Sequence, residues 1–355
     1  MSNENQLIKI ASFMLLISSI LDVPLCHAEI NGEFLLFPKV NLVYRSDLDN
    51  NSALDKDDQE LGVDFFTTFE INNFRFLGEF LATNKEQEFE RFQVGWLFKS
   101  HLYWLGRFHN PIGQWNSQYH HGAFLQTSIS RPAIVEFEEN GGILPVHQAG
   151  FLAEGTFDRG EQALGYALAL AAGPEFTDEL EPWDVLSPRS GTRDISATLN
   201  LYLDSELNTS GRVGVFVNYT KIPASAIGVS EIQQISSGVY GSWEFARWKW
   251  LGSSFYVHNQ FERSIGSETD SFFNAYLQAE YDLNNRWTFY GRIEGTAGNE
   301  GDAYLALFPK FVEDRILGGI RYDFSKQNAL NLEISANHMH QDDFAQVMLQ
   351  WSAMF

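Results

Sequence analysis

Residues 61–72 read Leu61-Gly62-Val63-Asp64-Phe65-Phe66-Thr67-Thr68-Phe69-Glu70-Ile71-Asn72, and in this stretch the odd positions are mostly apolar while the even positions are often polar. Successive side chains of a β-strand point to opposite faces of the sheet, so the pattern indicates a strand with one apolar face. The same alternation recurs at residues 92–98, 195–203, 213–219 and 287–294. The chain therefore repeats a sheet-forming unit along its length.

Sixteen segments of this kind can be placed in the sequence. They are residues 33–44, 61–72, 74–84, 90–99, 101–108, 148–157, 164–173, 194–203, 211–219, 232–246, 249–261, 271–282, 286–295, 314–324, 328–337 and 344–355. Most have the length of a tilted membrane-spanning strand, and an even number is typical of single-chain bacterial barrels. Alternation alone also leaves 14 and 18 strands open.

The connections between these segments are sorted by length. The odd ones are residues 45–60, 85–89, 109–147, 174–193, 220–231, 262–270, 296–313 and 338–343, and most of them are longer than the even ones, with 85–89 as the main exception. Outer-membrane barrels alternate long outer loops with short periplasmic turns. The pattern thus predicts a transmembrane antiparallel β-barrel over residues 29–355, whereas a secreted soluble sandwich has no reason to sort its loops in this way.

The first 28 residues differ from the rest. An apolar run from Ile10 to Leu21 follows Lys9, and Cys26-His27-Ala28 supplies the small residue of a cleavage site. This pattern predicts a signal peptide at residues 1–28, because the run is too short for a membrane-spanning helix. The single cysteine would leave with it, so the mature chain is expected to contain no disulfide.

Composition narrows the function further. The formal net charge is −22, which argues against nucleic acid as a partner, so none is expected. Aromatic residues form 15% of the chain although the mean hydropathy is −0.21, as alternating lipid-facing and lumen-facing positions would produce. The expected location is the outer membrane, with lipid and lipopolysaccharide as neighbours.

The connection 109–147, called the third loop below, is the longest and contains many apolar residues, which must be buried against something. Around it lie Gly106-Arg107-Phe108-His109-Asn110-Pro111-Ile112-Gly113, Ser130-Arg131-Pro132 and Gly150. These motifs resemble the phosphate-selective porin O and P family, over about residues 106–150. The resemblance implies a channel that is narrowed by a third outer loop folded into the lumen. The likeness to porins also implies a homotrimer. That family's anion selectivity depends on crowded basic residues, and no Lys/Arg-rich run stands out here.

Charged residues of the third loop and of inward-facing strand positions are the candidate site. The expected constriction consists of Arg107, Arg131, Glu136, Glu138 and Glu139, with the three glutamates facing wall arginines and Arg107 foremost among these. The expected lumen lining includes Arg75, Arg91, Arg212, Arg292 and Arg321, beside Glu70, Glu79, Glu244, Glu280, Glu294 and Glu333. Mixed signs argue against a strong ion preference. The alternative is that these residues only solvate a wet interior and pair with one another.

Metal and catalytic motifs are weak. The pairs His120-His121 and His338/His340 lack a clear ligand spacing, and the acidic first outer loop around Asp47 lacks the glycine of a calcium-binding turn. No nucleophile elbow, zinc-protease motif or P-loop occurs. We therefore expect no cofactor, no metal and no enzymatic activity, but a passive channel for small polar or ionic solutes. A transporter for hydrophobic solutes and a hydrolase at the barrel rim are the alternatives.

Overall fold

The structure is a computed structural model that describes residues 30–48, 52–119, 122–160, 162–184, 191–205, 210–224, 228–263, 266–340 and 342–355. The predicted signal peptide, residues 1–28, and the pair His120-His121 lie outside these residues. Among the described residues, no helix is long and apolar enough to cross a membrane.

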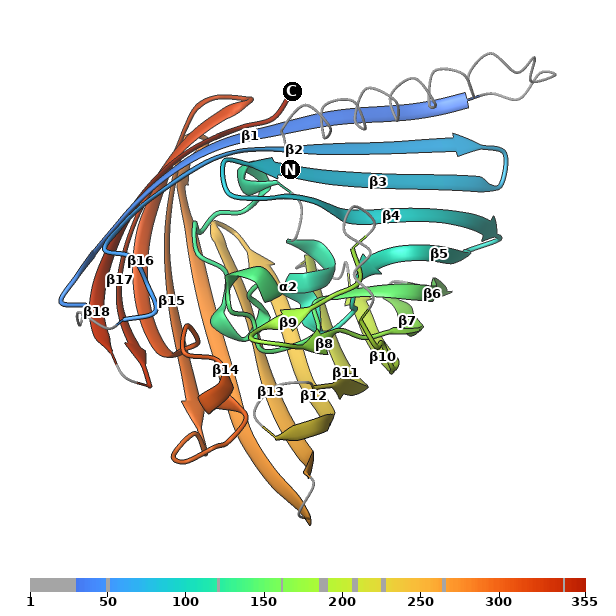
Figure 1. Cartoon of the computed structure of the whole chain (residues 1–355). Coiled ribbons are helices and arrows are strands. Elements are labelled where there is room, and N and C mark those ends of the chain that lie inside the picture. Colours follow the sequence, from blue (N-terminus) through green and yellow to red (C-terminus); the bar gives the residue numbers. More distant parts are fainter. Residues whose placement is uncertain are drawn as a thin grey trace, which may run out of the picture.

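Sixteen antiparallel strands close into one barrel, which confirms the predicted fold and strand number (Figure 1). Each predicted segment overlaps one wall strand. The wall strands are β1 (Ile30–Ser46), β2 (Asp57–Ile71), β3 (Phe74–Thr83), β4 (Gln87–Phe98), β5 (His101–His109), β6 (His147–Arg159), β7 (Gln162–Ala172), β10 (Ile195–Ser205), β11 (Ser210–Pro223), β12 (Val229–Phe245), β13 (Trp248–Arg263), β14 (Gly266–Asn284), β15 (Trp287–Ala297), β16 (Val312–Ser325), β17 (Asn328–Met339) and β18 (Asp343–Ala353).

The two faces of the wall differ as the alternation predicts. On β10, Leu199 and Leu201 are exposed on the outside, whereas Thr198 and Asn200 between them are buried in the interior. An apolar outer surface with polar groups inside is the arrangement that a barrel needs in a lipid bilayer, where every backbone hydrogen bond must also be made within the protein.

The barrel closes where β1 meets β18. Lys39 pairs with Ser352, and the pairing continues to Ser46 opposite Ala345. Beyond the Lys39 end of this ladder, the backbone groups of Leu36 and Phe355 exchange two hydrogen bonds of 2.9 Å. Along this ladder, closure satisfies the backbone donors and acceptors that a strand edge would leave open.

The connections depart from the predicted lengths at several places. Strands β13 and β14 pair as far as Arg263 and Gly266, so most of the predicted loop 262–270 belongs to a hairpin. The predicted loop 220–231 shortens in the same way, because β11 extends to Pro223. The strands continue here because Phe261 and Ile222 on their inner faces join the buried cluster inside the barrel.

Two connections carry structure of their own. The connection after β7 contains a small two-stranded sheet, β8 (Glu175–Phe176) and β9 (Leu180–Glu181), where a plain loop was expected. The connection after β15 contains the 3-10 helix η4 (Leu305–Leu307). Both are anchored by apolar residues in the buried cluster, Phe176 and Leu180 in the first case and Leu305 in the second.

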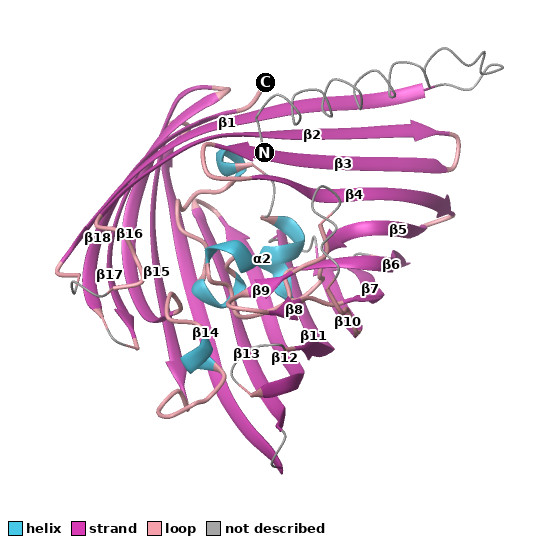
Figure 2. Cartoon of the chain, viewed as in Figure 1, coloured by secondary structure: helices cyan, strands magenta, loops and turns pink. Residues whose placement is uncertain are grey.

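The third loop folds into the barrel, as predicted. It contains the helix α2 (Gly113–Gln118) and three 3-10 helices, η1 (Ala123–Leu125), η2 (Ala133–Val135) and η3 (Glu138–Asn140). Figure 2 shows these helical turns enclosed by the ring of strands. The loop therefore occupies space that would otherwise be open lumen.

Candidate pore constriction

One side of the third loop packs on an apolar part of the wall. We call the inward-facing residues Phe216, Leu251, Phe255, Phe261, Phe272 and Tyr276 of β11, β13 and β14 the apolar wall. They form one buried cluster with Ile112, Trp115 and Ile134 of the loop. Trp115 meets Tyr276 edge to face with the ring centroids 6.2 Å apart. The apolar residues noted in the loop sequence thus find their burial partners here.

Another part of the loop is held by charged residues of the next strands along the wall, β15, β16 and β17. We call Arg292, Glu294, Arg315, Arg321 and Glu333 the charged wall. Arg292 donates to the carbonyls of Ser130 and Arg131 at 3.0 and 2.8 Å. Arg321 donates to the carbonyls of Phe124 and Gln126, both at 2.7 Å. Arginine suits this task because its guanidinium offers several donors in a fixed plane.

The carboxylates of the charged wall accept from the loop backbone. Glu294 accepts the Ala133 N–H at 2.7 Å, and Glu333 accepts the Ile129 N–H at 2.9 Å. The Ser130 hydroxyl also donates to Glu333. Buried backbone groups without partners would destabilise an irregular loop, and the charged wall supplies these partners.

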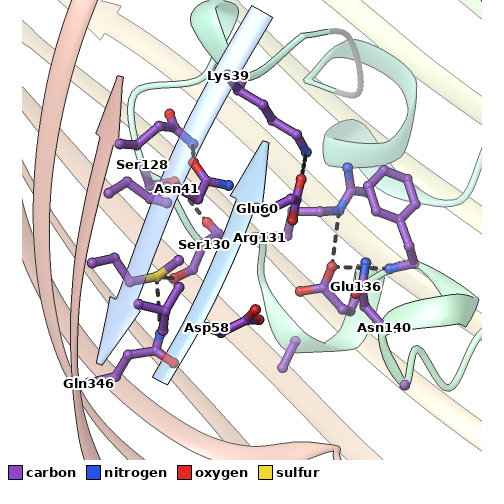
Figure 3. Close-up of a pocket in the computed structure, with 18 of the residues that line it drawn as sticks. Lys39, Asn41, Asp58, Glu60, Ser128, Ser130, Arg131, Glu136, Asn140 and Gln346 are labelled. Carbon is purple, nitrogen blue, oxygen red and sulfur yellow. Dashed lines mark hydrogen bonds and ion pairs between the residues drawn. The ribbon is translucent and has the colours of Figure 1, made fainter. Parts of the chain in front are cut away.

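The loop leaves a cavity of about 400 Å³ between itself and β1, β2 and β18. Figure 3 shows part of its lining, including Lys39 with Glu60 and Arg131 with Glu136. The charged residues that line it are six basic ones, Lys39, Arg45, Lys85, Arg131, Lys310 and Arg315, and seven acidic ones, Asp55, Asp58, Glu60, Asp64, Glu79, Glu90 and Glu136. Charges of both signs therefore face the same small volume.

Arg131 belongs to the third loop and lines this cavity. Its guanidinium donates to the Val135 carbonyl at 3.1 and 2.9 Å and lies 3.9 Å from the centre of the Phe137 ring. The nearest Glu136 oxygen is 4.0 Å away. The arginine is thus fixed by the loop itself, which gives the cavity one positive charge of defined position.

The other predicted constriction residues, Arg107, Glu138 and Glu139, do not line this cavity. Arg107 is buried and donates to the Trp183 carbonyl at 2.5 Å and to Glu88. Glu138 is buried and binds His147, with Oε2 2.9 Å from Nδ1. Desolvation, reinforced by the Glu90 carboxylate, raises the pKa of the half-buried Glu139 well above its usual range. Of the five residues, only Arg131 and Glu136 line the cavity.

The predicted lumen arginines divide into two groups. Arg75, Arg91 and Arg212 bind wall carboxylates, Glu70 at 3.0 Å, Glu79 at 2.6 Å and Asp204 at 2.5 Å respectively. Arg292 and Arg321 hold the third loop, as described above. The sequence analysis missed Arg315, which donates to the Arg131 carbonyl at 2.9 Å. It shares the inward face of β16 with Arg321, so strand alternation could have identified it.

Comparison with known proteins tests the fold. No protein-family model matches the sequence, and no curated protein matches it. Solved structures do match over most of the chain. The chain has a porin fold. The anion-selective porin from Comamonas acidovorans aligns with a TM-score of 0.58 and 14% identity, over 92% of this chain and 100% of its own.

Two further structures agree with that assignment. The outer membrane channel DcaP of Acinetobacter baumannii aligns with a TM-score of 0.56 and 13% identity, over 92% of this chain and 97% of its own. OmpT, an outer membrane protein of Vibrio cholerae, aligns with a TM-score of 0.55 and 8% identity, over 94% and 100%. At these identities the likeness concerns the architecture of the barrel and not its solute.

Proposed function

We propose that this chain is an outer-membrane porin, a passive aqueous channel for small polar or ionic solutes that is constricted by the third loop. The porin fold and the apolar outer surface support the location. The structural neighbours are described as outer membrane proteins or channels, and one as an anion-selective porin. Residues 1–28 would act as the export signal and be absent from the mature protein, which N-terminal sequencing can test.

The observation that carries the proposal is the charged cavity beside the third loop. Its volume of about 400 Å³ suits small solutes, and it is lined by charged side chains of both signs. Charged rings tune the passage of ions, and a mixed lining favours no single solute. The acidic residues exceed the basic ones by one, so we expect weak ion selectivity.

Planar-bilayer recording of the purified, full-length protein tests the channel. We expect an ohmic conductance that persists without any added solute other than salt. A silent membrane together with ester or peptide hydrolysis by the same preparation would favour the rim hydrolase. Uptake into proteoliposomes limited to apolar solutes would favour the hydrophobic transporter.

The resemblance of residues 106–150 to the phosphate-selective porin O and P family defines a finer test. If the channel shares that family's selectivity, inorganic phosphate should reduce the chloride conductance at millimolar concentrations. The ion pair between the buried Arg107 and the half-buried Glu88 neutralises the arginine of the Gly-Arg-Phe motif. We therefore expect phosphate to have little effect on the chloride current. A strong block by phosphate would instead support phosphate selectivity for this channel.

We further propose a homotrimer in a membrane containing lipopolysaccharide. A neighbouring structure of OmpT is described as a trimer form. On this chain, β1 to β4 carry a run of touching phenylalanine rings. The members are Phe34, Phe65, Phe80, Phe89, Phe92, Phe76 and Phe69. A broad aromatic surface of this kind suits contact between copies. Unheated gel migration and cross-linking should then give three copies, and a monomer would exclude the arrangement.

A further inference from the structure

The third loop leaves the wall and returns to it at two histidines. His109 is the last residue of β5 and His147 is the first of β6, and the two are direct partners in the strand pairing. Their rings meet edge to face with the centroids 5.2 Å apart. Both side chains are buried, so the neck of the loop is marked by two adjacent imidazoles away from bulk water.

A glutamate from the neighbouring strand completes the group. Glu90 of β4 is 3% exposed, and its Oε2 atom lies 2.6 Å from Nε2 of His147. The potential metal-binding atoms of Glu90, His109 and His147 all lie within 4.8 Å of one another. Two imidazole nitrogens and one carboxylate oxygen form a donor set that Zn²⁺ uses in proteins.

The surroundings of His147 match those of a metal-bound histidine. Its other ring nitrogen, Nδ1, lies 2.9 Å from Oε2 of Glu138. Glu138 is itself fixed, because its Oε1 atom accepts the N–H groups of Val146 and His147 at 2.6 and 2.9 Å. Histidines that bind metals usually donate their second N–H to such a held carboxylate, which sets the ring orientation and the tautomer.

We propose that Glu90, His109 and His147 form a binding site for a divalent transition-metal ion such as Zn²⁺, with Glu138 orienting His147. Ligand atoms of a tetrahedral zinc site are about 3.3 Å apart, given Zn–N distances near 2.05 Å. The present atoms need to approach by about 1.5 Å at most, which side-chain rotation can provide. An ion bound there would lie between His147 and Glu90, and its two positive charges would offset the carboxylates of Glu90 and Glu138.

The site has a consequence for the loop. An ion there joins three segments, the loop exit at His109, the loop return at His147 and the wall strand β4. It would restrict movement of the third loop at the one place where both of its ends meet the wall. This goes beyond passive conduction, because the metal content of the medium would then set the mobility of the constriction.

Metal titration of the full-length protein in detergent tests the site directly. After chelator treatment and dialysis, calorimetry with Zn²⁺ alone should give one site per chain, and Co²⁺ should give the visible absorption bands of tetrahedral coordination. We expect His109→Gln and Glu90→Gln to lower the zinc affinity more than about 100-fold. Glu138→Gln should lower it about 10- to 100-fold, as for other residues that orient a ligand.

His338→Ala is the matched control. His338 contacts Asp343 at 2.6 Å on the exposed end of β17, so it offers a histidine and a carboxylate outside the proposed site. We expect the His338→Ala variant to bind zinc at the Glu90–His109–His147 site with the same affinity as the unaltered chain. Zinc binding that persists in His109→Gln, or that is lost only in His338→Ala, would overturn the proposal, as would an absence of binding.

Folding and channel activity can be separated from the result. Heat-dependent gel migration reports whether each variant forms a barrel, and His109→Gln and Glu90→Gln keep polar side chains of similar size. Binding is measured without any conductance, so a chain that binds zinc but does not conduct refutes only the proposed function. A conducting chain that binds no zinc refutes only the metal site.

Discussion

Two neighbouring stretches of the barrel wall hold the third loop by different kinds of interaction. The apolar wall contacts the loop through rings and aliphatic side chains that form one buried apolar cluster. The charged wall contacts it through hydrogen bonds from Arg292, Arg315 and Arg321 and to Glu294 and Glu333. Trp115 touches both, since its ring meets Tyr276 and also lies 5.5 Å from the Arg292 guanidinium.

This difference assigns different tasks to the apolar wall and the charged wall. Apolar burial is nearly proportional to area and tolerates small shifts, so the apolar wall supplies attraction without fixing one position. Hydrogen bonds with charged partners are directional, so the charged wall fixes which loop residue stands opposite which strand. Buried ionic contacts add little net stability when intact but are costly to break on one side.

The largest change expected is in conductance when residues 122–141 are replaced by a short Gly/Ser linker. This removes the partners of the charged wall and about half of the third loop, so the single-channel conductance should rise severalfold. Bilayer recording measures it, with gel migration as the control for a folded barrel. An unchanged conductance would mean that the third loop does not limit the flow.

Breaking the charged wall at its centre should produce the next largest effect. Arg292→Met leaves Glu294, which binds the arginine at 2.8 Å, short of one buried partner. We expect a loss of about 3–5 kcal/mol in the free energy of unfolding, measured by urea titration in detergent. Arg75→Met is the control, because its ion pair with Glu70 lies at the exposed rim and should contribute at most about 1 kcal/mol. Equal losses for both variants would contradict the distinction.

Removing one methyl group from the apolar cluster should lower the free energy of unfolding by less and should not change ion selectivity. Ile232 of β12 is fully buried in the same cluster. Ile232→Val should lower the free energy of unfolding by about 0.5–1.5 kcal/mol, since one buried methyl group is lost. The zero-current potential in a salt gradient should not move. A shift in that potential would show that the apolar side also sets selectivity.

The smallest effect expected concerns the fixed charge of Arg131. A charge about 4 Å from an ion in water changes its energy by about 1 kcal/mol. Arg131→Gln should therefore move the zero-current potential modestly toward cation preference. Arg107→Gln is the matched comparison, and it should move the potential less because Arg107 is buried against Glu88. A larger shift in the zero-current potential for Arg107→Gln than for Arg131→Gln would support the prediction from the sequence that Arg107 lies at the constriction.

Strand alternation was sufficient to predict the wall. All sixteen strands follow from a local pattern, because burial on one side of a sheet imposes a period of two. The interior position of the third loop also follows, since its apolar residues needed a partner. The extended hairpin of β13 and β14 was missed because those residues pair in response to packing inside the barrel.

The pairing of inward charges could not be predicted in the same way. Alternation identifies Arg292 as a charged residue facing the lumen, and membership of the third loop identifies Glu138, but neither shows what these residues bind. Arg292 meets Ser130, which is 162 positions away, and Glu138 meets a histidine that strand pairing brings opposite His109. Such contacts depend on the position of the loop inside the closed barrel, and no local spacing encodes that position.

The junction of β1 and β18 also bears on how the chain folds. Its side chains meet over the longest separations in the molecule, as where Arg45 donates to Gln346, 301 positions away. The barrel cannot close before β18 has been synthesised, so this ladder has no local contacts to nucleate it. Until then the strands at the open seam expose unpaired backbone and apolar side chains. The unfinished barrel therefore needs protection from aggregation, and closure of the seam is expected to be a late and slow step of assembly.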